Sequence, residues 1–137
     1  MEKKFVIATV VLAVIGLLCT ATFADEGWLD SFDDALKQAG SEKKLVLVDF
    51  TATWCGWCTK LKEEVFEKDE FKQYVADKFV LVAIDADKNR ELVDKYGVNG
   101  FPTIMVLDEA GKEVHKIVGF KPLEEFIEEL KTVQPAK

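Results

Sequence analysis

The chain has 137 residues, and its 25 acidic side chains outnumber its 18 basic ones, so its net charge at neutral pH is −7. The basic residues are scattered among acidic ones and form no stripe, which excludes a nucleic-acid-binding surface. The length allows one domain with a sizeable core but not two. We therefore expect a single acidic domain that acts as a monomer and has no nucleic-acid partner.

The N-terminal segment predicts export from the cytoplasm. Lys3 and Lys4 precede Phe5 to Leu18, a stretch that is almost wholly apolar, and small residues follow it. This order is typical of a signal peptide, so we assign residues 1–24 to the signal and residues 25–137 to the mature domain, which would be periplasmic or otherwise extracytoplasmic. The alternative is an uncleaved membrane anchor, because the apolar stretch and the small residues together reach about twenty residues, just enough to span a bilayer.

The first two elements of the mature domain are a helix and a buried strand. Ser31 can cap a helix that ends at Gly40, since the apolar residues between them keep helical spacing; these residues are Phe32, Ala35, Leu36 and Ala39. The run from Leu45 to Phe50 is rich in valine and almost continuously apolar, a pattern typical of a central parallel strand that is covered on both faces.

The rest of the chain alternates helices with strands. A helix that includes Cys58 breaks near Lys68 and then resumes. The later elements are a strand at Phe79 to Ile84, a helix at Asn89 to Tyr96, a hairpin of strands at Ile104 to Leu107 and Val114 to Val118, and a helix after Pro122. This order predicts an α/β layer sandwich, with a central mixed sheet of four to five strands flanked by about four helices.

Two cysteines spaced as Cys-x-x-Cys carry the chemistry of the sequence. Cys55 follows the buried strand and opens a helix, where unpaired backbone N–H groups and the helix dipole favour the thiolate, the reactive form of cysteine. Cys58 lies one turn later on the same face, so it can attack a mixed disulfide formed through Cys55. The pair therefore predicts thiol–disulfide exchange, with the disulfide itself as the redox group and no other cofactor.

The alternative interpretations of this cysteine pair are a zinc half-site, a purely structural disulfide and two ordinary buried thiols. Zinc needs four ligands, and outside the motif the chain offers only Cys19 and His115. A structural disulfide that closes so short a loop would remove little chain entropy. We expect no metal site, and we expect His115, in an edge strand, to have a surface or packing role.

Asp49 is the one carboxylate within the first buried strand. Burial makes its charged form costly, so its pKa should be raised, and from the strand end it can relay a proton for Cys58. The alternative is a strand-end residue in contact with water. We therefore place Asp49 with Cys55 and Cys58 in the predicted catalytic set.

Several separate motifs resemble the thioredoxin superfamily across residues 28–133. In chain order they are Val48-Asp49-Phe50, Trp54-Cys55-Gly56-x-Cys58, Asp85, Tyr96-Gly97-Val98-x-Gly100-Phe101-Pro102-Thr103 and Gly119. The segment after Cys58 is longer than in cytosolic thioredoxin and is similar to that of exported members, including the C-terminal domain of the periplasmic thiol:disulfide electron carrier. The resemblance implies the thioredoxin fold and protein thiol–disulfide oxidoreductase activity.

The resemblance also implies a division of labour between the residues around the disulfide. Cys55 would be the nucleophile and Cys58 the resolving thiol. Pro102 would be a cis-proline that lies against the disulfide and lets the backbone of Phe101 pair with an extended substrate. The substrate-binding set implied in this way is Trp54, Gly56, Trp57, Phe101 and Pro102.

Several positions depart from the cytosolic type member of the superfamily, among them Thr51, Thr59, Trp57 and Leu81. Trp57, next to Cys58, is unusual at its position and would shape substrate contact or redox potential. Leu81 stands where the type member has a buried lysine that partners the aspartate. Without that lysine, we expect Asp49 to be harder to ionise.

Three functions follow from these observations. The favoured one is an oxidoreductase that reduces or isomerises the disulfides of exported proteins and is recharged by a membrane electron carrier. The second is a net oxidant of the same fold. The third is a binding module that uses the groove at Phe101 and Pro102 with little turnover. No histidine lies between the two cysteines to stabilise the thiolate, which favours a reductant over an oxidant.

Overall fold

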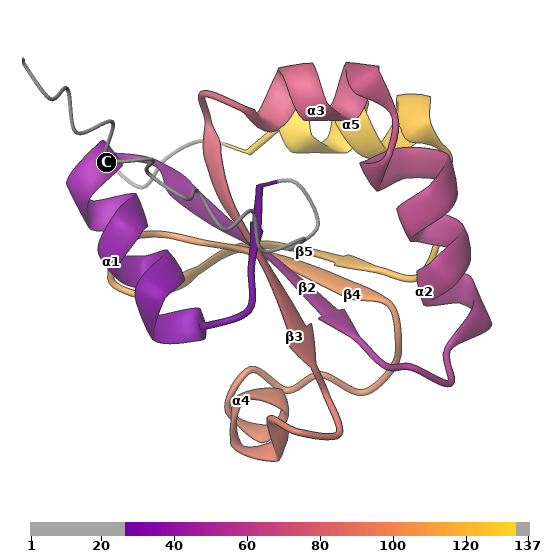
Figure 1. Ribbon diagram of the computed structural model, residues 1–137, viewed down its shortest axis with the longest axis horizontal. Coiled ribbons are helices and arrows are strands. Elements are labelled where there is room, and N and C mark those ends of the chain that lie inside the picture. The colour runs from indigo at the N-terminus through magenta and orange to yellow at the C-terminus, as the bar shows by residue number, and fades with distance from the viewer. Residues whose placement is uncertain (1–26, 134–137) are drawn as a thin grey trace, which may run out of the picture.

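A computed structural model of the protein describes residues 27–133 (Figure 1). The elements in chain order are β1 (Trp28–Leu29), α1 (Phe32–Glu42), β2 (Leu45–Thr51), α2 (Gly56–Leu61), the π-helical segment η1 (Lys62–Phe66), α3 (Asp69–Val75), β3 (Phe79–Asp85), α4 (Arg90–Lys95), β4 (Thr103–Leu107), β5 (Glu113–Val118) and α5 (Leu123–Lys131). The predicted signal, residues 1–24, lies outside the described residues. Within residues 27–133, no helix combines the length and the apolar character that crossing a bilayer requires.

The strands form one mixed sheet in the order β1-β3-β2-β4-β5. The first three strands in this order are parallel, while β4 runs antiparallel to both β2 and β5. The predicted mixed sheet is therefore confirmed, with five strands. The strand that the sequence did not predict individually is β1, which has two residues and pairs with β3 through Trp28 and Leu81. A strand this short has no periodicity that could predict it.

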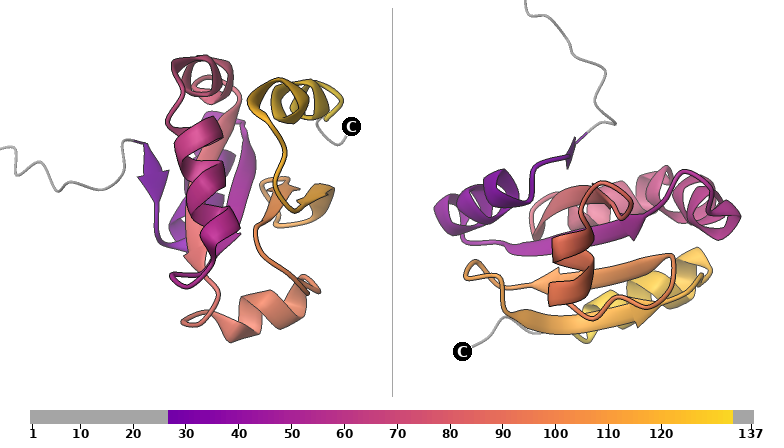
Figure 2. Two further views of the ribbon diagram at one scale, coloured as in Figure 1. Left: turned by 90° about the vertical axis from the view of Figure 1, so that its right-hand side faces the viewer. Right: turned by 90° about the horizontal axis from the view of Figure 1, so that it is seen from below.

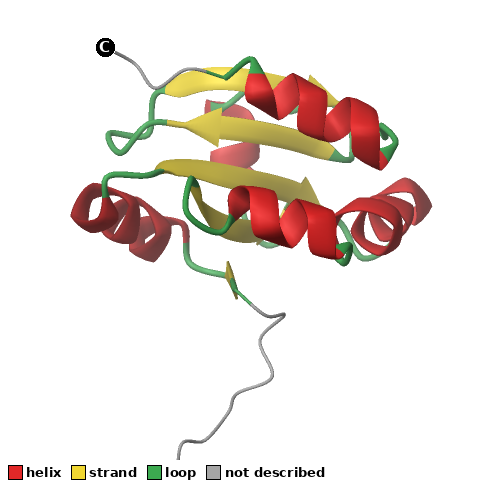
Figure 3. Ribbon diagram, turned by 90° about the horizontal axis from the view of Figure 1, so that it is seen from above, coloured by secondary structure: helices red, strands yellow, loops and turns green. Residues whose placement is uncertain are grey.

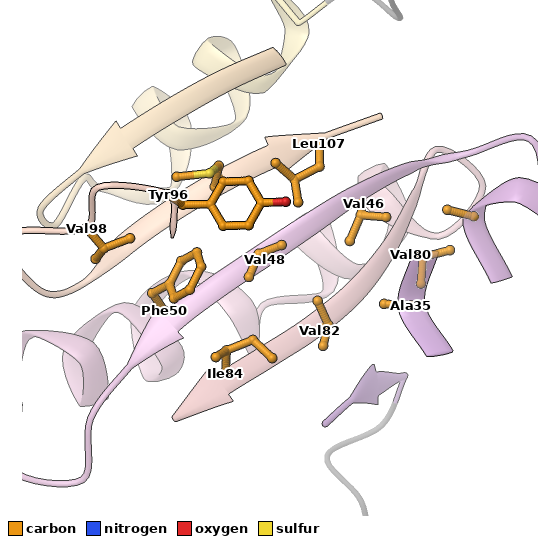
Figure 4. Packing of buried hydrophobic residues seen from close by; sticks show 12 residues of the cluster. Ala35, Val46, Val48, Phe50, Val80, Val82, Ile84, Tyr96, Val98 and Leu107 are labelled. Atoms are coloured by element: carbon orange, nitrogen blue, oxygen red, sulfur yellow. The ribbon is translucent and has the colours of Figure 1, made fainter. Parts of the chain in front are cut away.

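The alternation of side chains along β2 builds two cores, one on each face of the sheet. Val46, Val48 and Phe50 face a core that α1 and the segment around Tyr96 cover (Figure 4). Leu47 faces the opposite core, which α2, η1, α3 and α5 cover. Asp49 has the same parity as Leu47, so the strand period directs its carboxylate towards the helices that follow Cys58.

The helices separate into two groups around this sheet. Phe71 of α3 and Phe126 of α5 have ring centroids 5.9 Å apart, and the two helices lie side by side on one side of the sheet (Figure 3). The short helix α4 crosses the strands on the other side, in the foreground when the molecule is seen from below (Figure 2). Both faces of the central strands are therefore covered, as the continuous apolar run of β2 predicted.

The end of the first helix differs from the prediction. Gly40 does not stop α1, which continues to Glu42 and ends where Lys43 adopts a left-handed conformation with a φ of 55°. The N–H groups of Lys43 and Lys44 both donate to the carbonyl of Ala39 there. Glycine weakens a helix by only about 1 kcal/mol. Ala39 is completely buried against the sheet, and this packing keeps the chain helical through Gly40.

The segment after Cys58 breaks near Lys68, as predicted. Lys68 has an extended conformation, with a φ of −77° and a ψ of 137°, and α3 begins at the next residue. Before the break the chain runs through α2 and then widens into the π-helical η1. Within residues 27–133 there are consequently five α-helices plus η1, where about four helices were expected.

Candidate active site

The two cysteines lie at the start of α2, directly beyond the end of β2, and are joined in a disulfide with their Cα atoms 5.3 Å apart. Cys55 is the N-cap of α2, with an extended conformation at a φ of −90° and a ψ of 103°. Its Sγ accepts a hydrogen bond from the backbone N–H of Cys58, with the two atoms 3.2 Å apart. The N–H of the third residue of α2, one of the N–H groups without a backbone acceptor at the helix start, therefore points at the sulfur of Cys55, as the sequence predicted.

The disulfide is nearly covered, although it is flanked by exposed aromatic rings. Cys55 is 7% exposed and Cys58 is 6% exposed, and both pack with Ala52 in a small cluster. Trp54 and Trp57, by contrast, are 67% and 58% exposed. The two rings therefore lie on the surface beside a small exposed area of sulfur, and this exposure distinguishes them from core aromatics.

The loop before β4 carries the predicted proline and packs against the cysteines through Phe101. The peptide bond between Phe101 and Pro102 is cis, which confirms the prediction, and Phe101 packs against the cysteine cluster. Two hydrogen bonds hold this loop in place: Thr103 Oγ1 donates to the carbonyl of Gly100 at 2.7 Å, and the N–H of Gly119 donates to the carbonyl of Pro102 at 2.9 Å.

Trp54 is held in position from two directions. Its indole Nε1 donates a hydrogen bond to Asp87 Oδ2 at 2.9 Å. Its ring meets the ring of Phe101 edge-on, with the centroids 5.9 Å apart. Such a ring offers a fixed surface to a partner at little entropic cost.

Trp57 is held in a second aromatic cluster on the other side of the motif. Its ring lies 5.8 Å from the ring of Phe120, between centroids. Lys60 Nζ lies over both rings, 5.1 Å from the centroid of Trp57 and 4.9 Å from that of Phe120. We define Trp57, Phe120 and Lys60 as the aromatic–lysine cluster; it combines apolar surface with a positive charge.

Asp49 lies beneath the disulfide in a largely apolar setting. It is 8% exposed, and its Oδ1 is buried without a hydrogen-bond partner within residues 27–133. Burial raises the pKa of Asp49 from its ordinary 3.8 to about 7, while the positive charge of Lys62 acts in the opposite direction. The raised pKa predicted from the strand pattern is confirmed.

A pocket of about 570 Å³ connects Asp49 with Cys58 and with solvent. Its walls include Asp49 from β2, Cys58 from α2, Lys62 and Phe66 from η1, and Asp85 from β3. Position 81 is a leucine here, where the family's type member has a lysine. The site nevertheless has a cation, because Lys62 reaches the pocket from the helical side. Burial nevertheless outweighs that charge, so Asp49 remains hard to ionise, as expected.

The remaining predicted residues are placed as follows. Gly56 is the first residue of α2, and a side chain added there would meet no atom within 4 Å, so its position leaves open space beside the disulfide. His115 lies in the edge strand β5, where its Nε2 is 2.9 Å from Glu129 Oε1 of α5, away from the cysteines. Within residues 27–133, no three His, Cys, Asp or Glu side chains are grouped as they would be around a metal ion.

Sequence reasoning missed four residues that contact or face the site: Lys60, Lys62, Asp87 and Phe120. Lys60 follows Trp57 by three positions and Lys62 follows Cys58 by four, and these helical spacings are a signal that could have found both lysines. Phe120 follows the motif glycine Gly119, but nothing in the sequence places it against Trp57. Asp87 is separated from Trp54 by more than thirty positions in the sequence, and only the fold brings them together.

Comparison with known proteins agrees with this geometry. Residues 32–134 match the family described as Thioredoxin-like domain. The chain is 45% identical over 86 residues to the thioredoxin of Bacillus subtilis (strain 168), a match that covers 63% of this chain and 79% of that protein. It is 30% identical over 105 residues to the disulfide bond reductase DsbH of Chlamydia pneumoniae, covering 68% of this chain and 63% of that protein.

A solved structure also matches. The C-terminal domain of DsbD from Neisseria meningitidis, in its oxidised form, superposes with a TM-score of 0.62 at 29% identity, over 74% of this chain and 89% of that domain. Protein disulfide isomerases of plants and fungi are matched over only 17% to 29% of their length. The fold, the family match and the Cys-x-x-Cys at the start of α2 lead to one conclusion: the chain belongs to the thioredoxin-like family of thiol–disulfide oxidoreductases, with Cys55 and Cys58 as its disulfide.

Proposed function

We propose that the protein is exported and reduces or isomerises disulfides of other exported proteins through Cys55 and Cys58. The Cys55 thiolate attacks one sulfur of a substrate disulfide, which forms a mixed disulfide and releases the other substrate sulfur as a thiolate. Cys58, after losing its proton to Asp49, then attacks Cys55 Sγ. This second step releases the reduced substrate and forms the Cys55–Cys58 disulfide, so two electrons pass from the protein to the substrate.

The observation that carries this proposal is the hydrogen bond from the Cys58 N–H to Cys55 Sγ. A donor that is already aimed at this sulfur stabilises negative charge on it, which is the form that attacks. Cys58 has no equivalent place at the helix start, because it lies inside α2 and lines the pocket with Asp49. The two thiols therefore have different surroundings, which suit an attacking thiol and a resolving thiol.

Three observations support reduction and an extracytoplasmic location. No histidine lies between the cysteines, and the residue next to Cys58 is the uncharged Trp57. One relative is named a disulfide bond reductase, and the DsbD C-terminal domain superposes on this chain. The N-terminal sequence is typical of an export signal, residues 1–24, that precedes a domain of residues 25–137. A membrane electron carrier is the partner that we propose for restoring the dithiol after each turnover.

We further propose that an extended segment of the substrate lies across the exposed rings on either side of the disulfide. Trp54 and Phe101 form one side and the aromatic–lysine cluster forms the other. Gly56 leaves open space between them, and Phe101 packs against the two cysteines. This arrangement offers apolar contact beside the reacting atoms and suits protein substrates better than small thiols.

The redox potential tests the direction of electron flow. We expect equilibration with glutathione buffers to give a potential more negative than the value of about −180 mV for protein disulfide isomerase, towards the value of about −270 mV for thioredoxin. A value near the roughly −120 mV of the oxidant DsbA, with the protein fully oxidised in cells, would instead assign a net oxidant. A double cysteine variant that keeps full function would assign a binding module.

Replacing Trp57 by alanine tests the substrate surface. We expect KM for a protein disulfide to rise about two- to twelvefold, because a single aromatic contact contributes about 0.5–1.5 kcal/mol and each 1.4 kcal/mol is a tenfold change. Trp57→Phe keeps a ring against Phe120 and should recover most of the loss. Steady-state kinetics with a protein substrate and with a small disulfide distinguish a loss of protein binding from a general loss of reactivity. An equal loss on both substrates would contradict a role of Trp57 in protein binding.

A further inference from the structure

We propose that Lys62 is the charge partner of Asp49 and that, through Asp49, it sets the pH range in which Cys58 resolves the mixed disulfide. Lys62 is thus a positioning residue, and its role rests on the proposed function of Asp49 as the proton acceptor. Position 81 on the sheet is a leucine and carries no charge, so Lys62 supplies the positive charge near Asp49 from the helical side.

Helical geometry places Lys62 over Cys58. The two residues are four positions apart, so they lie on one face of the helix, and the N–H of Lys62 donates to the carbonyl of Cys58. Long helical side chains lean back towards the N-terminus of their helix. The ammonium group of Lys62 is therefore directed over the turn that carries Cys58, and both side chains line the pocket that Asp49 borders.

Asp49 needs a charge partner more than any other carboxylate of the site. It is 8% exposed, and its Oδ1 has no hydrogen-bond partner within the described part of the chain. An ionised carboxylate in such a place is strongly destabilised unless a cation or donor faces it. Lys62 is the cation whose field favours the charged form of Asp49.

The other charged groups around the pocket come from three further positions. Glu67 lies at the end of η1, Lys72 on α3 and Asp85 at the end of β3, and all three line the pocket. Of the charged side chains that line the pocket, Lys62 is the one whose charge acts on the pKa of Asp49. Lys72 lines the same pocket from another helix, and it serves below as a charge-matched control.

The chain widens into the π-helical η1 at Lys62 itself. The N–H of Glu67 donates to the carbonyl of Lys62 at 2.9 Å, five residues back instead of four. Such segments inside helices are frequent at functional sites. Lys62 therefore stays on the helix face of Cys58, while Val65 and Phe66, which follow it in η1, are buried in the core.

The exposure of Lys62 determines how strong the effect is. The residue is exposed, so its ammonium group remains hydrated and water screens its attraction to Asp49. The pair therefore adjusts the ionisation of Asp49 without cancelling the effect of burial, which still holds its pKa at about 7. This value lies where a proton acceptor responds to small changes of charge near neutral pH.

The test follows the second half-reaction of the Lys62→Met variant, because methionine keeps the length and apolar stem of lysine without its charge. Preformed mixed disulfide with a substrate is allowed to resolve between pH 5 and 9, and its lifetime is read by rapid acid quench and mass spectrometry. Removal of a cation raises the pKa of a carboxylate, so we expect the midpoint of the rate profile to move up by roughly half to one pH unit. Below the midpoint the rate should fall about three- to tenfold, whereas at pH 9 the two proteins should converge.

Three further variants separate this role from others. Lys62→Arg should restore the original midpoint, because it restores the charge. Lys72→Met removes a positive charge from the same pocket, and because Lys62 is the cation that acts on the pKa of Asp49, the midpoint should move much less than in Lys62→Met. In an Asp49→Asn background, Lys62→Met should add no further shift. A shift that persists there would mean that Lys62 acts on Cys58 directly, and it would overturn the proposal.

An independent readout needs no turnover. The carboxyl carbon of Asp49, labelled with ¹³C and followed by NMR in the reduced protein, should titrate at higher pH in Lys62→Met than in the parent. An unchanged titration would overturn the role of Lys62 and leave the proposed function intact. Reduction of protein disulfides that continues in Cys55→Ser would contradict the proposed function itself.

Discussion

Replacing Cys55 by serine should reduce the rate of insulin-disulfide reduction by this protein to the uncatalysed background. A hydroxyl cannot form the mixed disulfide, and Cys58 cannot substitute, because it lies inside α2 while Cys55 holds the capping position where the N–H of Cys58 faces the sulfur. Serine also has nearly the same size as cysteine, so the packing against Ala52 and Phe101 should survive. The turbidity assay with dithiothreitol as electron donor measures the loss.

The matched variant is Cys58→Ser, which should still attack but should not release its substrate. Mixed disulfides through Cys55 should then accumulate, and they can be identified by non-reducing electrophoresis and peptide mass mapping. Far-UV circular dichroism of both variants checks that the fold persists. Substrates trapped on Cys58 in Cys55→Ser would reverse the assignment of the two thiols, and full turnover by Cys55→Ser would contradict it.

The parts of the site that sequence predicted are those set by local patterns. The apolar run of β2 places Asp49 with a fixed parity, and the spacing of Cys55 and Cys58 places both sulfurs in the first turn of α2. The cis bond before Pro102 followed from family resemblance, because most X–Pro bonds are trans and no local pattern in this chain selects the isomer.

The parts that sequence did not predict depend on contacts between distant segments. Phe120 reaches Trp57, and Asp87 reaches Trp54, only because the sheet order brings the ends of β5 and β3 to the two sides of α2. The end of α1 was missed for a related reason. Glycine at position 40 suggested a stop, but the burial of Ala39 in the sheet outweighs the local preference.

The direction in which the pKa of Asp49 shifts can be predicted from burial alone, but the identity of its charged neighbour cannot. Sequence comparison with the type member indicated that a lysine was missing at position 81, on the sheet. The structure supplies Lys62 from a helix instead, through the four-residue helical spacing between Cys58 and Lys62. Compensation of this kind is invisible to a comparison made one position at a time.

Replacing Asp49 by asparagine should stabilise the protein, and the gain should grow as the pH rises. The pKa of Asp49 is about 7 in the folded protein and has its ordinary value of 3.8 when the chain unfolds. Between these values the folded state binds the extra proton, so the free energy of unfolding falls as pH rises from about 4 to about 7 and then levels off. Asparagine resembles the protonated carboxyl and has no such dependence, and because Oδ1 has no hydrogen-bond partner among the described residues, little is lost with it.

The difference between the variant and the parent should therefore be small at pH 4 and largest above pH 7. A displacement of about three pH units corresponds to roughly 4 kcal/mol as an upper bound, because each unit is worth about 1.4 kcal/mol. Urea unfolding of the oxidised proteins at several pH values measures it, with Asp33→Asn as a control, since that aspartate is exposed in the first turn of α1. The control should show a small difference without a midpoint near pH 7. A gain in stability of Asp49→Asn that is the same at pH 4 and pH 8, or a loss of stability at pH 8, would contradict this prediction. Either result would mean that Asp49 ionises in the folded protein as easily as in water, so its carboxylate could not retain a proton near neutral pH for the step at Cys58.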